Sequence, residues 1–383
     1  MQLKFTPFFS VVTLYLLANT FFLFFTLFNK NLINIEFMYF FVETNILIKA
    51  LSFQMVALIF LIFLYKSFNL KRMNANRVFE SKAGFFLFFW QFIFLVFAMI
   101  WGLGVVDTDS SAPHFLVMVS NFISADILYY LIAPSLISRK LFFLNTVLYL
   151  VSSIFRGWLG GIVLAFFVYL CRVGYVKISL KSFISFAILF FVLLLISPFL
   201  IDMKFLIRTG EEIKFDFTNY GMKLEAAINY LLGRFQHIGH TGVLINQSAL
   251  YHQLYNEGKI LPFWLEGIPQ YFLYKLLGNN EVLTFAQTMA VYSFGASASN
   301  PWNTNTGISG WFIILHEKSI LFVVYWALII FFIFRFISKY ANQQTFNIIS
   351  VLMIIYLYHG WLGSFFNLII LSFLIIFLKR LKV

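Results

Sequence analysis

The stretch AGFFLFFWQFIFLVFAMIWGLGVV, residues 83–106, contains no acidic or basic side chain, and Gln91 is its only position that is neither apolar nor glycine. A helix of about 20 apolar residues is long enough to cross the roughly 30 Å hydrocarbon core of a bilayer. A helix also satisfies its own backbone hydrogen bonds, which lipid cannot do for it. The stretch therefore predicts a transmembrane helix.

Comparable apolar runs recur along the 383-residue chain, which is 61% hydrophobic and 11% charged. The mean hydropathy of +0.88 excludes an ordinary soluble domain, because a globule of this size could not bury so many apolar side chains. We predict an all-α, polytopic integral membrane protein with ten transmembrane helices. They are expected near residues 5–28, 45–65, 83–106, 114–137, 141–155, 158–176, 182–201, 319–338, 344–358 and 363–378.

Basic residues set the orientation, because lysine and arginine are retained on the cytoplasmic side of short loops. With the N-terminus inside, the cytoplasmic segments hold 16 of the 27 basic residues, and Glu80 is their only acidic residue. We therefore place both termini in the cytoplasm. The net charge of +12 reflects these flanking positions, so no nucleic-acid partner is predicted.

The ten spans divide the chain into a membrane bundle of seven helices at 1–201, a polar segment at 202–310, and a bundle of three helices at 311–383. The polar segment is too rich in Gly, Pro and Asn to cross a membrane, and the orientation makes it one large periplasmic loop. Residues 222–238 within it have the apolar spacing of an amphipathic helix lying at the membrane interface.

Charged and ionisable side chains concentrate in the stretch NYLLGRFQHIGHTG, residues 229–242 of this loop. Tyr230, Arg234 and His237 are spaced i, i+4 and i+7, so a continuous helix would project them in one direction. Gly239 is expected to end that helix, and His240 to fold back near the same place. Arginine pairs with phosphate oxygens and histidine exchanges protons near neutral pH. The alternative is a basic face that only touches anionic lipid headgroups.

A second outer arginine, Arg156, lies in SSIFRGWLGG at the turn between the fifth and sixth spans. Glycines beside it allow close approach of a ligand or helix, although an arginine near a helix end can also be a simple membrane anchor. Asp126 lies inside the fourth span, where an ionisable group is expensive and is a functional candidate or a structural partner. His359, at the outer end of the ninth span, is a further candidate.

The end of the loop reads SASNPWNTNTGISGWFIILHEKSI, residues 297–320. Trp302, Asn303 and Thr306 offer the flat apolar faces and neutral hydrogen-bonding groups that sugars need, although a re-entrant loop has a similar composition. Asp107 and Asp109 suit a divalent cation but are also typical of a solvated turn. With Cys171 as the only cysteine, a thiolate metal site is excluded, and we predict no cofactor and no metal site.

Together these features resemble the O-antigen polymerases, the Wzy-type enzymes that join lipid-linked oligosaccharide repeat units. The resemblance rests on the topology and on three short stretches: FRG at 155–157, GRFQHIGHTG at 233–242 and NTNTGISGWF at 303–312. It implies a GT-C-like membrane glycosyltransferase of the bacterial inner membrane with undecaprenyl pyrophosphate as its leaving group. A chain-length regulator of the Wzz type and a flippase of the Wzx type are the partners that it implies.

Carried onto this chain, the resemblance makes Arg156 and Arg234 the residues that hold the pyrophosphate, and His237 or His240 the general base. Tyr230, Trp302, Asn303, Thr306, Asp126 and His359 are the predicted substrate-binding residues. An O-antigen ligase or a transferase that uses a polyprenyl-phosphate sugar is the alternative within the same class. The related ligases are expected to carry a histidine where this chain has Asn303 and Thr306. A flippase or transporter is the alternative from another class, although it would place charges along its helices rather than in one loop.

Overall fold

The computed structural model of the chain describes residues 3–35, 38–68, 79–105, 110–178, 180–209, 219–267, 282–298, 302–304 and 306–380. Most of this part of the chain is helical. The first half contains the helices α1 (Pro7–Phe28), α2 (Thr44–Lys66), α3 (Ser81–Trp101), α4 (His114–Phe122), α5 (Ala125–Ile132), η2 (Ala133–Ser135), α6 (Arg139–Phe155), α7 (Gly160–Val173) and α8 (Leu180–Thr209). The second half contains α9 (Tyr220–Phe235), α10 (Ile238–Asn246), α11 (Ser248–Asn256), α13 (Phe285–Phe294), α14 (Gly307–Leu315), η3 (His316–Lys318), α15 (Ser319–Tyr340), α16 (Gln343–His359) and α17 (Leu362–Arg380).

Each of the ten segments predicted as a span is helical, which confirms the all-α class. Five helical segments of the described chain are long and apolar enough to cross a membrane: Pro7–Phe28, Thr44–Lys66, Ser81–Trp101, His114–Ser135 and Gly307–Tyr340. This number is half of the predicted ten, because helices such as α7 and α16 have only 14 and 17 residues.

Large apolar side chains cover the outer faces of the long helices. Leu17 on α1, Phe63 on α2, Phe89 on α3 and Phe332 on α15 are each more than 60% exposed. A water-soluble protein rarely leaves a contiguous apolar surface of this kind uncovered. These faces indicate that the helices are embedded in a membrane.

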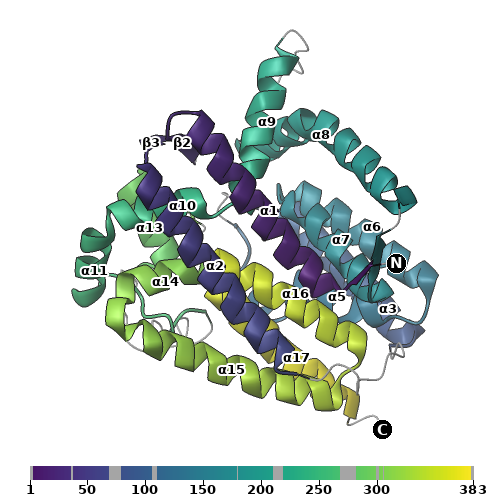
Figure 1. Ribbon diagram of the computed structural model, residues 1–383. Helices are drawn as coiled ribbons and strands as arrows, with labels where there is room; N and C mark the ends of the chain where they lie inside the picture. The colour runs from purple at the N-terminus through teal and green to yellow at the C-terminus, as the bar shows by residue number, and fades with distance from the viewer. Residues whose placement is uncertain are drawn as a thin grey trace.

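α16 is the centre of the bundle, and all of its residues from Gln344 to His359 are buried. It packs against α1, α7, α14 and α17 (Figure 1). The side chain of Asn342 accepts a hydrogen bond from the Thr345 amide and so caps its N-terminus. Gly360, with a φ of +83°, ends it in the left-handed conformation that favours glycine. α16 therefore connects the two ends of the bundle through its core.

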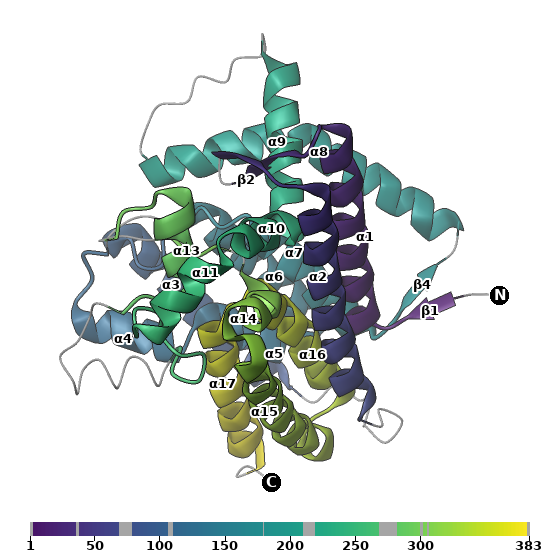
Figure 2. The ribbon, with the colours of Figure 1, turned by 60° about the vertical axis from the view of Figure 1, so that its left-hand side comes forward.

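Two small antiparallel sheets lie at the ends of the bundle. β1 (Leu3–Phe5) pairs with β4 (Val176–Ile178), next to the N-terminus. β2 (Leu32–Ile35) and β3 (Met38–Phe41) form the connection between α1 and α2, which run side by side. α8 leads from β4 to α9, against which it packs, and Figure 2 shows it strongly tilted relative to α1 and α2.

The structure divides the predicted interfacial helix at 222–238, so the prediction of one continuous helix is wrong. α9 ends at Phe235, and a second helix, α10, begins at Ile238. The backbone amides of His237 and Ile238 donate to Oδ1 of Asn19 on α1, at 2.9 and 3.2 Å. The side chain of Gln236 accepts from the amide of Gly239 at 2.8 Å. These side chains satisfy the first amides of a new helix, so His237 precedes α10 and does not share the face of Arg234 on α9.

Candidate functional site

The junction of α9 and α10 meets α1 and α16 in a group of buried polar side chains. We call Tyr15, Asn19, His237, Tyr358 and His359 the histidine cluster. The hydroxyl of Tyr15 is 2.7 Å from Nε2 of His359, and Nδ2 of Asn19 donates to the hydroxyl of Tyr358 at 2.9 Å. The rings of His237 and His359 are 4.5 Å apart. Residues distant in sequence are thus joined at one point of the bundle.

The other predicted histidine, His240, lies one turn along α10 and is also buried. Its ring is 5.7 Å from that of Phe294 on α13. His359 in turn stacks on Trp361 with the ring centres 4.8 Å apart. Arg234 and His240 both act electrostatically on His359. The structure therefore brings together Arg234, His237, His240 and His359, four of the residues that the sequence singled out.

The exit of the large loop reaches the same end of α16. Gly307 and Gly360 touch through their backbones, and a Cβ on Gly307 would lie 2.5 Å from the carbonyl oxygen of Tyr358. Thr306 is buried, and its Oγ1 would lie 2.8 Å from a Cβ on Gly360. Both glycines have a positive φ, so neither position suits another residue. Two of the three stretches that carry the family resemblance therefore meet beside His359.

Gln54 on α2 forms hydrogen bonds with both of these stretches. Nε2 of Gln54 lies 2.6 Å from Oγ1 of Thr241 on α10 and 2.6 Å from Oγ of Ser309 on α14. All three side chains are buried. A buried hydrogen-bond network of this kind fixes the relative position of its helices, because separating them leaves polar atoms without water or partners.

Beside the histidine cluster, α8 and α9 bring two cations to one tyrosine. Nζ of Lys204 donates to the hydroxyl of Tyr230 at 2.6 Å, and the guanidinium carbon of Arg234 lies 5.0 Å from the centre of the same ring. Lys204 is only 3% exposed. Burial raises the pKa of Tyr230, but the charges of Arg234 and Lys204 outweigh it, and the net result is a lowered pKa. We call Lys204, Tyr230 and Arg234 the cationic triad.

Two other predicted site residues, Arg156 and Asp126, form a bidentate ion pair. Nη1 and Nη2 of Arg156 donate to the two carboxylate oxygens at 2.9 and 2.7 Å. Nε donates to the carbonyl oxygen of Ser152, and the guanidinium lies over the ring of Phe94. α5, which carries Asp126, packs against α16. Arg156 is thus held by the protein itself.

Other predicted site residues lie apart from these contacts. Trp302 is 39% exposed, and Asn303 is exposed as well. Asp107 and Asp109 lie outside the described residues. No group of three or more His, Cys, Asp or Glu side chains that could hold a metal ion occurs in the described part of the chain.

Several residues of the site escaped the sequence analysis. Tyr15 and Asn19 are single polar residues in an apolar span, and their i, i+4 spacing on one helix face was the only signal that they act together. Lys204 follows the seventh predicted span and looked like an ordinary flanking charge.

Glu266, after α11, is buried against the first turn of α17, where the Gly363 amide donates to it at 3.5 Å. Burial raises the pKa of Glu266 to about 8.

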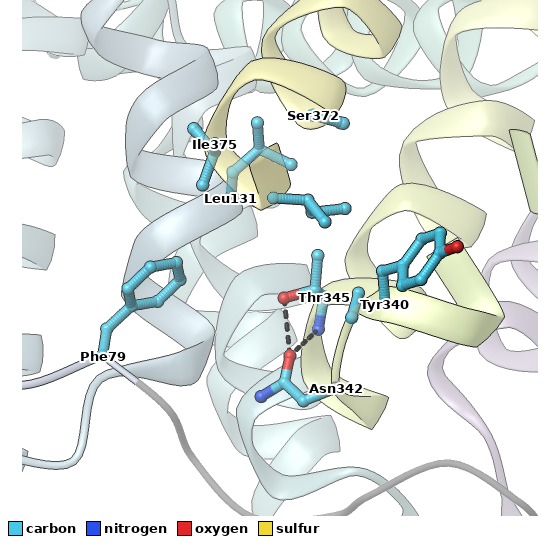
Figure 3. A pocket seen from close by; sticks show the side chains of 9 residues that line it. Phe79, Leu131, Tyr340, Asn342, Thr345, Ser372 and Ile375 are labelled. Carbon is cyan, nitrogen blue, oxygen red and sulfur yellow. Dashed lines mark hydrogen bonds between the residues drawn. The ribbon is translucent and has the colours of Figure 1, made fainter. Parts of the chain in front are cut away.

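A small pocket lies at the other end of α16 (Figure 3). It is lined by residues that include Phe79, Leu131, Thr345 and Ile375, and they come from α5, α16, α17 and the segment before α3. Oδ1 of Asn342 there accepts from both the amide and the hydroxyl of Thr345, as the dashed lines in Figure 3 mark. This polar group caps a helix, and the pocket is separated from His359 by the length of α16.

The histidine cluster and the cationic triad offer complementary chemistry. Ammonium and guanidinium groups bind phosphate oxygens through charge-assisted hydrogen bonds, and imidazoles can accept or donate a proton near neutral pH. The surrounding apolar helices exclude water, which strengthens the hydrogen bonds of the cations to an anion. Comparison with protein-family models, with curated proteins and with solved structures found no match to this chain.

Proposed function

We propose that this protein is a membrane glycosyltransferase that polymerises lipid-linked oligosaccharide repeat units, as the O-antigen polymerases do. The observation that carries the proposal is that the junction of α9 and α10, with Arg234 in the last turn of α9 and His237 at the start of α10, meets His359 of α16. A cation that binds a diphosphate and imidazoles that exchange a proton are the two elements that glycosyl transfer from a lipid diphosphate requires. The contact of the loop exit with Tyr358 and Gly360 adds the neutral groups of Thr306 and Ser309 to the same region.

In the proposed reaction, a hydroxyl oxygen of the acceptor repeat unit attacks the anomeric carbon of the donor glycan. The bond from that carbon to the diphosphate oxygen breaks, and undecaprenyl pyrophosphate leaves with the electron pair. The hydroxyl proton passes to His237 or His240, a role worth about 10²- to 10⁴-fold in rate. Arg234 neutralises the charge that grows on the diphosphate, and a preorganised donor of this kind is worth about 10²- to 10³-fold.

Arg156 takes a positioning role in this proposal. Both terminal nitrogens of its guanidinium already donate to Asp126, so the pair holds α5 against the end of α6. α5, which carries Asp126, packs against α16, on which His359 is carried. Arg234 is left as the arginine that meets the diphosphate directly.

The proposal includes a membrane topology with ten spans, cytoplasmic termini and the loop of residues 202–310 in the periplasm. The distribution of the basic residues supports this orientation. The helical state of every predicted span supports the proposed count, and the short helices α6, α7, α16 and α17 each pack against other helices of the bundle. The GT-C-like fold, the inner membrane, and partners of the Wzz and Wzx type belong to the same proposal through the family resemblance.

The test is a deletion of the gene in a strain with smooth lipopolysaccharide. Loss of a polymerase leaves the lipid A core carrying a single repeat unit, which electrophoresis of the lipopolysaccharide resolves from the normal ladder. A bare core after deletion contradicts the polymerase and indicates a ligase or a flippase instead. An unchanged ladder contradicts a role in this process altogether.

A matched pair of variants tests the site within the same strain. Complementation with Arg234→Ala should leave a single repeat unit, because the charge that meets the diphosphate is lost. Complementation with Arg335→Ala, an exposed arginine at the other end of the bundle, should restore the ladder. Both variants are compared at equal protein levels in the membrane fraction. A full ladder from Arg234→Ala would contradict its assignment.

A further inference from the structure

Two histidines outside the histidine cluster lie next to each other where α11 meets η3. The ring centres of His252 on α11 and His316, the first residue of η3, are 4.6 Å apart, and the ring planes make an angle of 71°. α11 packs against α14, and Figure 1 shows it beside the junction of α14 and α15. The fold thus joins two imidazoles that no short sequence motif connects.

A backbone carbonyl fixes the tautomer of His252. Nδ1 of His252 lies 2.9 Å from the carbonyl oxygen of Ile314, and because a carbonyl oxygen only accepts hydrogen bonds, Nδ1 carries the proton. In the neutral ring, Nε2 then presents a lone pair. Histidines that bind metal ions almost always donate their other ring N–H to a carbonyl oxygen or a carboxylate. His252 therefore has the hydrogen bond that orients a metal-binding histidine.

The backbone of His316 adopts a conformation that favours glycine. Its φ is +48° and its ψ is −122°, at the point where α14 ends. A residue other than glycine in this region is strained, and strained residues concentrate at functional sites. The side chain of His316 is exposed, and within the described chain its ring contacts the ring of His252. The strained turn thus holds one imidazole against the other.

A pair of imidazoles in this arrangement suits a zinc ion. Imidazole nitrogens bind zinc at about 2.0–2.1 Å, so two rings with centres 4.6 Å apart can each supply one nitrogen to a shared ion. Zinc is also without an electronic preference for one geometry. The described chain places no third His, Cys, Asp or Glu side chain in a group with the pair. The other positions of a four-coordinate ion are therefore open to water or to an external ligand.

We propose that His252 and His316 together bind a zinc ion, which joins α11 to the turn between α14 and α15. One nitrogen comes from each ring, Nε2 in the case of His252, and water fills the remaining positions. Glu317 and Lys318 follow in η3 and are both exposed, so their opposite charges leave the local balance near neutral. α14 starts at Gly307, beside the histidine cluster, and the ion lies at the other end of this helix.

The experiment is isothermal titration calorimetry of the full-length protein in detergent micelles with zinc chloride, after purification through a tag without histidine. His252→Ala and His316→Gly each remove one ligand. Each should weaken zinc binding by more than the roughly 10- to 100-fold that the loss of an outer-shell partner costs. His114→Ala removes an exposed histidine at the start of α4 and is the matched control, so it should bind zinc as wild type does.

His316→Gly also separates the loss of a ligand from a loss of structure. Glycine adopts a positive φ without strain, so this variant should fold, and without zinc it should melt at or above the temperature of wild type. An ion that binds only the folded chain stabilises it by mass action. Added zinc should therefore raise the melting temperature of wild type and of His114→Ala, but not that of His316→Gly.

Wild-type zinc affinity in both His252→Ala and His316→Gly would overturn the proposed site. The same holds for a zinc-dependent rise of the melting temperature in His316→Gly that equals the rise in wild type. These measurements need neither glycan nor turnover. A deletion strain that keeps its lipopolysaccharide ladder would contradict the polymerase and leave the zinc site as it is.

Discussion

At the scale of single residues, the Arg156–Asp126 pair contrasts with the cationic triad. Arg156 is 5% exposed, and its guanidinium is fully engaged by a carboxylate, a backbone carbonyl and an aromatic ring. In the triad, Lys204 and Arg234 instead share one tyrosine. The first arrangement satisfies a charge within the fold, whereas the second gathers two cations around one phenol. The two outer arginines of the sequence therefore have different roles.

The ion pair predicts a stability difference between single and double variants. Asp126→Ala leaves a buried guanidinium unpaired and should lower the free energy of unfolding by about 3–5 kcal/mol. Replacing both partners, as in Asp126→Ala with Arg156→Leu, should cost clearly less, because no uncompensated charge is left. Unfolding of the detergent-solubilised proteins in denaturant measures the free energy of unfolding of both variants.

Lys259→Ala, which breaks an exposed pair with Glu257, serves as the control and should leave the free energy of unfolding unchanged. Equal losses in the single and double variants would contradict this account.

The sequence singled out several of the residues that the structure brings together, but not their partners. Arg234, the histidines and Asp126 stand out because charge is rare in this composition. Asn19 joins α1 to Tyr358 and to the first amides of α10, yet an asparagine in an apolar span is equally compatible with an isolated polar residue. The pairing of Arg156 with Asp126 depends on how α5 and α6 meet, which no local pattern contains.

At the scale of elements, the division of the predicted interfacial helix is the most informative difference. The apolar spacing at 222–238 continues smoothly through Gln236, so the sequence alone predicts one helix. Side-chain hydrogen bonds interrupt the helix here. Asn19 of α1 accepts from the amides of His237 and Ile238, and Gln236 accepts from the amide of Gly239. Tertiary contacts thus override a local pattern and bury His237 where it meets α16.

The contact between the loop exit and α16 predicts an effect that a matched glycine can control. Gly307 and Gly295 both have a φ of +66°, but a Cβ on Gly307 would lie 2.5 Å from the carbonyl oxygen of Tyr358, whereas a Cβ on Gly295 meets nothing within 4 Å. Gly295→Ala should cost about 1–2 kcal/mol through its left-handed backbone alone. Gly307→Ala should lower the melting temperature much further, because α14 must move away from α16. Thermal unfolding in detergent measures the difference, and equal shifts would contradict a close backbone contact.

At the scale of the whole molecule, the positions of the helices were more predictable than their ends and their packing. Hydropathy places every apolar run, because moving long apolar helices out of water is strongly favourable wherever they occur in the chain. It does not show that α8 is strongly tilted or that α4 and α5 break at Ile123 and Ser124. Those features depend on contacts between helices distant in sequence.

The proposed orientation can be tested by labelling single cysteines. Cys171 is the only cysteine in the chain and is buried, so Cys171→Ala gives a background without reactive thiols. Asn256→Cys at the exposed end of α11 should react with a membrane-impermeant maleimide added to spheroplasts. Ser81→Cys at the start of α3 should react only after the membrane is opened, because basic residues keep that end in the cytoplasm. The reverse pattern would invert the topology and remove the site from the periplasm.

The pairing of β1 with β4 has a consequence for biosynthesis. Leu3–Phe5 leave the ribosome early, but the strand that completes their sheet, Val176–Ile178, follows only after α1 to α7 have been translated. Until then the opening strand has no backbone partner in this sheet, and its edge is open to pairing with other chains. The sheet can therefore form only after the first seven helices have been made.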